Sequence, residues 1–168
     1  MKTDKIIKLV TAALFAAMTC IVTMLHIFNY GNGAYIHPGD AFVMLSGIIL
    51  GPIYGGISAG IGSMFADLIL AAPQYAPATF FIKLLAAMLT AYSYRKLRSH
   101  SVIIAGAFGG IIVTLGYFIY ERFLYSSVEI ALVGVPGNIL QSIIGIVFVS
   151  LLLPILRKVP QIRIMMEK

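Results

Sequence analysis

Two charged side chains interrupt a long apolar stretch of the chain. Within residues 41–94 the only charged side chains are those of Asp67 and Lys83. A charge at the centre of a membrane helix costs about 2.5–3.5 kcal/mol on insertion scales, so such charges are usually retained for a role. Asp67 lies six residues before Pro73, and Lys83 lies six residues after Pro77. At about 1.5 Å per residue, both would lie roughly 9 Å below one surface. The spacing predicts a helical hairpin with an acid and a base side by side. A purely structural pair, in which the two charges only neutralise each other, is the alternative.

Further polar side chains fall near the same predicted surface. Tyr117 and Glu121 are four residues apart at the end of one apolar segment, and Asn138 and Gln141 are three apart at the start of the next. Both spacings place a pair on one helix face. With polar groups from the loops, they predict a partly aromatic pocket that binds a small polar ligand. The candidate substrate-binding residues are His37, Asp40, Asp67, Gln74, Tyr75, Lys83, Tyr117, Glu121, Asn138 and Gln141.

The sequence offers little for catalysis or for metal binding. It contains no GxxxxGK[ST] loop for nucleotide phosphates and no HExxH pattern, and its three histidines are dispersed. The single Cys20 excludes an internal disulfide. We therefore expect no catalytic residue, no metal and no cofactor in this chain.

The composition is typical of a membrane protein. The chain has 168 residues, of which 60% are hydrophobic and 11% charged, and a mean hydropathy of +0.98. Soluble domains are roughly half apolar and a quarter charged. We expect an all-α integral membrane protein, with one domain over residues 1–168, built as a compact bundle of six transmembrane helices. The approximate spans are 9–28, 40–50, 53–72, 78–94, 101–120 and 136–156.

The basic residues predict the orientation of this bundle. Six spans place ten of the twelve lysines and arginines on one side, together with both termini. By the positive-inside rule both termini are cytoplasmic, and the loops at 26–39, 73–77 and 121–135 face outward. Pro136 suits the first turn of the sixth span. The net charge of +6 then reflects orientation in a lipid bilayer, with no nucleic acid as partner.

Small residues mark one face of the first span. Ala12 and Ala16, like Ala13 and Ala17, are four residues apart in its cytoplasmic half. Small residues at this spacing let membrane helices approach closely. The pattern predicts a docking stripe for another membrane protein, and packing within the bundle is the alternative.

Over essentially its whole length the sequence resembles the substrate-binding (S) components of energy-coupling-factor (ECF) vitamin transporters. The resemblance is carried by the six predicted spans, the alanine stripe, YIHPGDAFVMLSGIILGPIYGGISAGIGSMFADLI at 35–69 and PQYAPATFFIK at 73–83. Within that family these segments are most similar to members for vitamin B6 or hydroxymethylpyrimidine.

The resemblance implies how the chain would work. An S component in the bacterial plasma membrane captures its vitamin at the outer face, under a lid that here would be roughly residues 28–39. It docks through the first helix on an ECF transmembrane coupling protein with two ATPase subunits. ATP is used by those partners, and the loaded component topples to release its cargo inside.

The polar and aromatic side chains of the predicted pocket favour an aromatic heterocycle as the vitamin. Asp67, Lys83 and Glu121 could bind hydroxyl or ring-nitrogen groups, and Tyr75 or Tyr117 could stack on a ring. Pyridoxine fits best, and hydroxymethylpyrimidine nearly as well. The alternatives are an S component for another vitamin such as pantothenate, a self-sufficient proton-coupled carrier, and an envelope scaffold that binds no ligand.

Overall fold

The computed structural model describes residues 2–25, 28–29, 35–96 and 101–167. This part of the chain is a helical bundle with one short antiparallel ribbon, in which Phe28 pairs with Ile36. The elements in chain order are α1 (Lys2–Met24), β1 (Phe28–Asn29), β2 (Tyr35–Ile36), α2 (Gly39–Leu50), α3 (Pro52–Ile69), α4 (Ala76–Lys96), α5 (Val102–Leu124), α6 (Val128–Leu156) and α7 (Pro160–Glu167).

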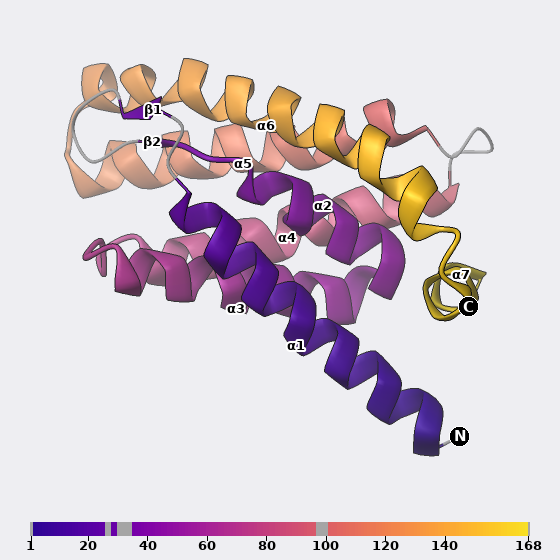
Figure 1. Cartoon of the computed structure of the whole chain (residues 1–168). Helices are drawn as coiled ribbons and strands as arrows, with labels where there is room; N and C mark the ends of the chain where they lie inside the picture. The colour runs from indigo at the N-terminus through magenta and orange to yellow at the C-terminus, as the bar shows by residue number, and fades with distance from the viewer. Residues whose placement is uncertain (1, 26–27, 30–34, 97–100, 168) are drawn as a thin grey trace.

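Helix α2 is the buried centre of the bundle. All of its 12 residues except Phe42 are buried, and it contacts α1, α3, α4, α6 and α7 (Figure 1). A helix that is apolar all round gains most when other helices cover every face. It ends at Gly51, whose φ of +85° is a conformation that glycine adopts without strain. Pro52 then occupies the first turn of α3, where its missing N–H costs nothing.

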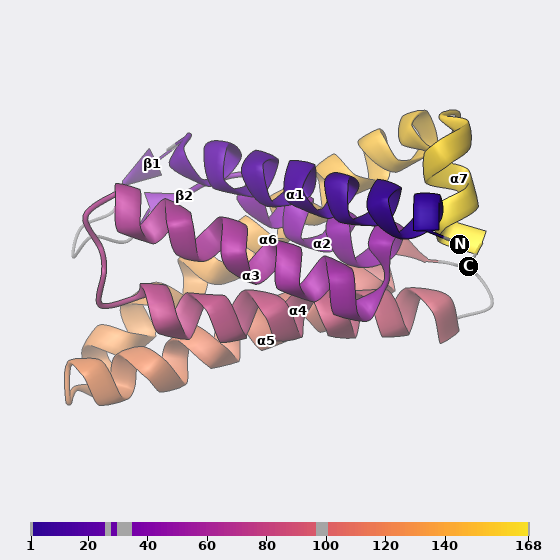
Figure 2. The same cartoon turned by 90° about the horizontal axis from the view of Figure 1, so that it is seen from below.

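The bundle has two distinct ends. The β1–β2 ribbon, the α3–α4 turn and the α5–α6 turn lie at one end, which we call the hairpin end (Figure 2). Both chain termini and α7 lie at the other, which we call the terminal end. This arrangement groups the loops as the sequence analysis predicted.

The outer surface of the bundle is apolar. Val10, Ile103, Phe123 and Leu151 are each more than 60% exposed. Among the described residues, four stretches are long and apolar enough to cross a membrane: Lys5–Met24, Ala76–Lys96, Val102–Leu124 and Val128–Leu156. Helix α2 is about 18 Å long at 1.5 Å per residue and does not reach across a bilayer core of about 30 Å. The six-span count therefore stays a prediction beyond these four.

The sequence-based boundaries differ from the structure at three places. The first predicted span, 9–28, corresponds to α1, which begins at Lys2 and ends at Met24. The connection predicted at 121–135 is helical except for residues 125–127, because the Ser127 hydroxyl caps α6 by accepting from the Ile130 N–H at 3.2 Å. Pro136 consequently lies inside α6. The predicted tail after 156 contains the short helix α7, which Pro160 begins.

Candidate functional site

A buried ion pair lies at the start of α2. Lys83 of α4 donates from Nζ to Oδ1 of Asp40, and the side chains are 2% and 1% exposed. Asp40 occupies the first turn of α2, where the helix dipole favours a negative charge. The predicted pairing of Lys83 with Asp67 is therefore wrong, because α2 begins inside the bundle and brings Asp40 to the lysine.

Helix α6 completes the coordination of this carboxylate. Gln141 donates from Nε2 to Oδ2 of Asp40 at 3.0 Å, so both carboxylate oxygens accept a hydrogen bond. Gly145 lies one turn further along α6, and a Cβ there would come within 3.2 Å of the Asp40 Cβ. The missing side chain at Gly145 lets α6 approach closely enough for Gln141 to reach.

An aromatic ring covers the lysine from the α5 side. Lys83 Nζ lies 5.4 Å from the centroid of the Tyr117 ring, within the range of a cation–π contact. The Tyr117 hydroxyl lies 2.9 Å from the Thr79 hydroxyl, one turn before Lys83 on α4. We call Asp40, Lys83, Thr79, Tyr117 and Gln141 the ion-pair cluster.

The ribbon leads into this cluster. His37 follows β2 and is buried, and its Nδ1 accepts from the Gly39 N–H at 3.1 Å. This bond satisfies one of the backbone donors that the start of a helix leaves open. His37 thus anchors the ribbon to α2 beside Asp40.

A second group of polar side chains, the tyrosine–glutamate cluster, lies at the hairpin end. Its members are Tyr75, Tyr120, Glu121 and Tyr125. The Tyr75 hydroxyl donates to Glu121 Oε1 at 3.3 Å and lies 3.0 Å from the Tyr125 hydroxyl. The Tyr75 ring is 5.7 Å from the Tyr120 ring and 6.4 Å from that of Tyr117, which joins the two clusters. Burial raises the pKa of Tyr75 above its ordinary value, with a smaller contribution from the bond to Tyr125, so the phenol stays a donor.

Glu121 has unused hydrogen-bonding capacity. Its side chain is buried, and Oε2 has no hydrogen-bond partner among the described residues. Gly134 of α6 faces this oxygen, since a Cβ there would lie 2.6 Å from it. Buried polar atoms are rarely left unsatisfied in folded proteins. A donor group from a ligand would complete this site.

Three of the predicted ligand residues are members of neither cluster. Gln74 is exposed and contributes its backbone carbonyl, which accepts from the Tyr120 hydroxyl. Asn138 is half-buried, and its backbone carbonyl accepts from Ser142 Oγ at 2.9 Å. Asp67 is buried near the end of α3, and it is not the ion-pair partner of Lys83. The other seven predicted residues lie in the two clusters or, for His37, next to them.

Sequence reasoning missed three members of the clusters. Thr79 lies four residues before Lys83, and Tyr125 lies four residues after Glu121, so each is on the same helix face as a residue already singled out. Tyr120 is the immediate neighbour of Glu121. The i,i+4 spacing could have identified the first two.

One serine motif has a packing role. Gly56, Ser58 and Gly60 have the GxSxG spacing of a nucleophile elbow, which occurs at a strand-to-helix turn. Here they lie inside α3, and Ser58 Oγ donates to the Ala12 carbonyl at 2.7 Å. The motif joins α3 to α1 and supplies no nucleophile.

The alanine stripe of α1 divides between two faces. Ala12 and Ala16 lie towards α3, since the Ala12 carbonyl bonds Ser58 and the Ala16 carbonyl abuts Gly62. Ala13 and Ala17 are exposed. A smooth outward surface therefore remains at Ala13 and Ala17.

The sequence was compared with protein families and with known proteins. A family model described as "ECF-type riboflavin transporter, S component" matches residues 3–158. A protein of Pyrococcus woesei, described as "Uncharacterized protein in gap 3'region", is 29% identical over 132 residues, covering 78% of this chain and 88% of that protein.

Two solved structures share the fold. The S component of a bacterial ECF transporter aligns with a TM-score of 0.72 at 20% identity, over 92% of this chain and 97% of that one. The S component for biotin from an ECF-type ABC transporter aligns with a TM-score of 0.59 at 23% identity, over 92% and 94%.

Proposed function

This chain belongs to the S components of ECF transporters, the substrate-binding subunits, and we propose that its ligand is a small aromatic nitrogen heterocycle of the vitamin type, with pyridoxine the first candidate. S components are not enzymes, and they work with an ECF module of membrane and ATPase subunits. That division of labour argues against the self-sufficient proton-coupled carrier.

The observation that carries the ligand proposal is the buried Oε2 of Glu121, which has no hydrogen-bond partner among the described residues. Glu121 accepts from Tyr75, whose ring contacts the rings of Tyr117 and Tyr120. A ligand hydroxyl or N–H would donate to this oxygen, and its ring would pack on Tyr75 or Tyr117. Pyridoxine offers three hydroxyls and a ring nitrogen on one aromatic ring. Hydroxymethylpyrimidine offers a hydroxyl, an amine and two ring nitrogens, and is the next candidate.

The ion pair between Lys83 and Asp40 distinguishes vitamins that carry a carboxylate from uncharged ones. Lys83 is already neutralised by Asp40, so a carboxylate ligand would have to displace a buried partner. This argument disfavours pantothenate, and it disfavours biotin, which the structural neighbour binds. Riboflavin, named in the matching family model, is an uncharged aromatic heterocycle with hydroxyls and stays a candidate.

The remaining parts of the proposal concern orientation and docking. We place the hairpin end outside and the terminal end in the cytoplasm of a bacterial cell, with the single domain crossing the plasma membrane six times. The lid would include the β1–β2 ribbon, while residues 30–34 lie outside the described residues. Ala13 and Ala17 would dock on the coupling protein.

Thermal unfolding of the purified chain in detergent tests the ligand directly. A ligand at 100 times its Kd stabilises by about 2.7 kcal/mol. For a chain of this size that is a rise in Tm of roughly 5–11 °C. Pyridoxine should produce this shift in the wild type and a smaller one in Glu121→Gln, whereas the exposed Glu129→Gln is the matched control.

The panel should also contain hydroxymethylpyrimidine, riboflavin, biotin, pantothenate and thiamine. A shift with riboflavin alone would replace pyridoxine as the ligand. The absence of a shift with every compound would overturn the proposed site.

A further inference from the structure

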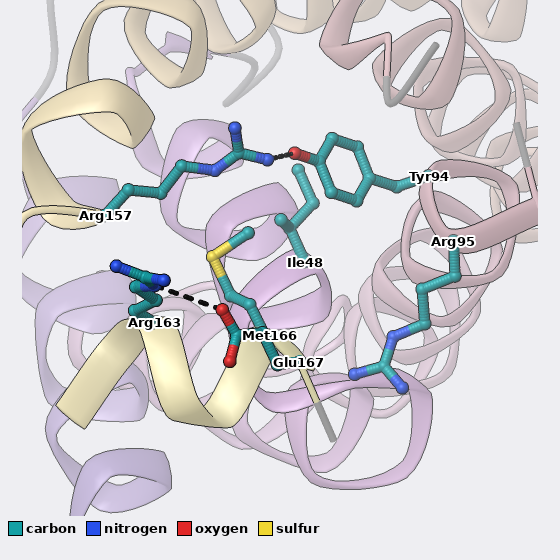
Figure 3. Close-up of a pocket in the computed structure, with 7 residues that line it drawn as sticks. All are labelled: Ile48, Tyr94, Arg95, Arg157, Arg163, Met166 and Glu167. Atoms are coloured by element: carbon teal, nitrogen blue, oxygen red, sulfur yellow. Dashed lines mark hydrogen bonds and ion pairs between the residues drawn. The ribbon is translucent and has the colours of Figure 1, made fainter. Parts of the chain in front are cut away.

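A basic pocket lies at the terminal end, remote from both clusters. It has a volume of about 410 Å³, and α2, α4, α7 and the end of α6 contribute its walls (Figure 3). Arg95, Arg157 and Arg163 line it, with Glu167 as the acidic group among its lining residues. Three guanidinium groups against one carboxylate leave the lining with a net charge of +2.

The three arginines are engaged to different degrees. Arg157 donates to the Tyr94 hydroxyl, and its guanidinium lies 5.9 Å from that ring. Arg163 pairs with Glu167 at 3.1 Å, but both side chains are more than 60% exposed, so the pair contributes little. Arg95 has no ion pair or side-chain hydrogen bond to any described residue, and Figure 3 shows its guanidinium at the pocket without a marked bond.

The chemistry of this lining fits a phosphate group. A guanidinium presents its N–H donors in a planar fork that matches two phosphate oxygens, and Arg95 and Arg163 have donors to spare. Ile48 and Met166 add apolar surface to the same pocket. A phosphate attached to a glycerol and hydrocarbon body would use both parts of the lining.

Helix α7 places the pocket at a lipid surface. Met165 of α7 is buried against the core of the bundle, whereas Arg163 and Ile164 are exposed. Ile155, near the end of α6, is 61% exposed. A short amphipathic helix that follows a membrane span and carries both basic and apolar exposed residues lies in the headgroup region. Basic pockets at that depth bind anionic headgroups.

We propose that this pocket binds the phosphate of an anionic phospholipid in the membrane leaflet at the terminal end. The proposal rests on the chain being a membrane protein and is independent of the vitamin. Arg95 and Arg163 hold the phosphate, Tyr94 orients Arg157 beside it, and Met166 contacts the glycerol backbone. Glu167 is left to accept from a headgroup hydroxyl, which favours phosphatidylglycerol.

The test measures phosphatidylglycerol retained by the full chain in nanodiscs of mixed phosphatidylglycerol and phosphatidylcholine. The wild type should retain about one phosphatidylglycerol per chain on extraction and native mass spectrometry. The double variant Arg95→Gln/Arg163→Gln should lose retention by about tenfold or more, on the scale of one lost charge-assisted hydrogen bond. Lys158→Gln removes an exposed charge that does not line the pocket and should retain the lipid.

Additional variants and conditions distinguish a lipid phosphate from a free phosphate and show whether the variants fold. Arg95→Lys/Arg163→Lys keeps the charge without the fork and should restore retention only in part, and an unchanged Tm in pure phosphatidylcholine shows that the variants fold. Equal loss in Lys158→Gln would overturn the pocket, because any basic charge would then suffice. Displacement of the lipid by millimolar inorganic phosphate would assign the site to a free anion and overturn the lipid. Loss of ECF-module binding by the double variant in pure phosphatidylcholine would assign the arginines to an acidic partner protein instead.

Discussion

Removal of the Lys83 ammonium should strongly destabilise the fold. Lys83→Met keeps most of the side-chain volume and leaves the Asp40 carboxylate, 1% exposed, with Gln141 as its remaining side-chain donor among the described residues. Breaking a buried ion pair by deleting one partner costs about 3–5 kcal/mol, because the other charge cannot reach water. For a chain of this length, 1 kcal/mol corresponds to about 2–4 °C in Tm. The expected fall in Tm is therefore roughly 6–20 °C.

The measurement is thermal unfolding of both proteins in the same detergent, with circular dichroism as the readout of helix content. Lys96→Met is the matched control, since Lys96 lies on the same helix and is exposed, and its hydrogen bond and cation–π contact among the described residues are both with Tyr92. Such surface changes usually alter stability by less than about 0.5 kcal/mol.

A second variant separates charge from volume. Lys83→Met/Asp40→Leu removes both members of the pair, and an apolar replacement of a whole buried pair is often neutral or stabilising. Its Tm should recover most of the loss. If Lys83→Met unfolds no earlier than Lys96→Met, or if the double variant is no more stable than Lys83→Met, the ion pair does not hold α2 in place.

The remaining predictions concern the other parts of the site. Glu121→Gln should raise the Tm slightly, because an amide is easier to bury than a carboxylate, and should weaken pyridoxine binding by about tenfold in calorimetry. Equal affinity of wild type and variant would remove Glu121 from the site. Burial raises the pKa of Tyr75 in the folded state, so its contribution to stability is present below about pH 10, the ordinary tyrosine value, and declines as the pH rises through the folded pKa. Tyr75→Phe should flatten the alkaline fall of Tm with pH, and an unchanged alkaline profile would contradict this assignment. Ala13→Leu should leave vitamin binding intact and abolish uptake in cells that carry the ECF module, whereas Ala16→Leu should lower the Tm, because Ala16 lies where α1 packs against α3 and a larger side chain would overpack that interface. Loss of binding in Ala13→Leu would show that the exposed stripe supports the pocket.

Much of this architecture is predictable from the sequence because the strongest signals are local. The long apolar segments appear as helices, the break at Gly51-Pro52 separates α2 from α3, and seven of the ten polar candidates lie in or next to the two clusters. The start of α6 was less predictable, since Ser127 caps the helix while Pro136 lies inside it. A proline signals a first turn in an isolated sequence, but membrane helices tolerate it in the interior.

The partner of Lys83 could not be predicted, because it depends on how far α2 lies inside the bundle. Counting residues from Pro73 and Pro77 placed Asp67 and Lys83 at the same depth. That count assumes that every apolar segment begins at the membrane surface. Helix α2 instead begins at Gly39 beneath the ribbon, and Asp40 reaches the lysine from the side. Only the packing of the five helices that contact α2 fixes that position.

The buried start of α2 also explains why the residues before it are polar. A helix that begins inside a bundle exposes backbone N–H groups with no water to bind, and each unsatisfied group would cost several kilocalories per mole. His37 Nδ1 accepts from the Gly39 N–H, and the Asp40 carboxylate lies in the first turn, where the dipole is positive. The buried Asp40 carboxylate is neutralised by Lys83, and Lys83 is stabilised by Asp40 and by the ring of Tyr117. A ligand would not easily displace Asp40 from this pair. Asp40 is therefore already engaged, whereas Oε2 of the buried Glu121 has no hydrogen-bond partner among the described residues, which is why a ligand that donates hydrogen bonds fits this bundle better than an anion does.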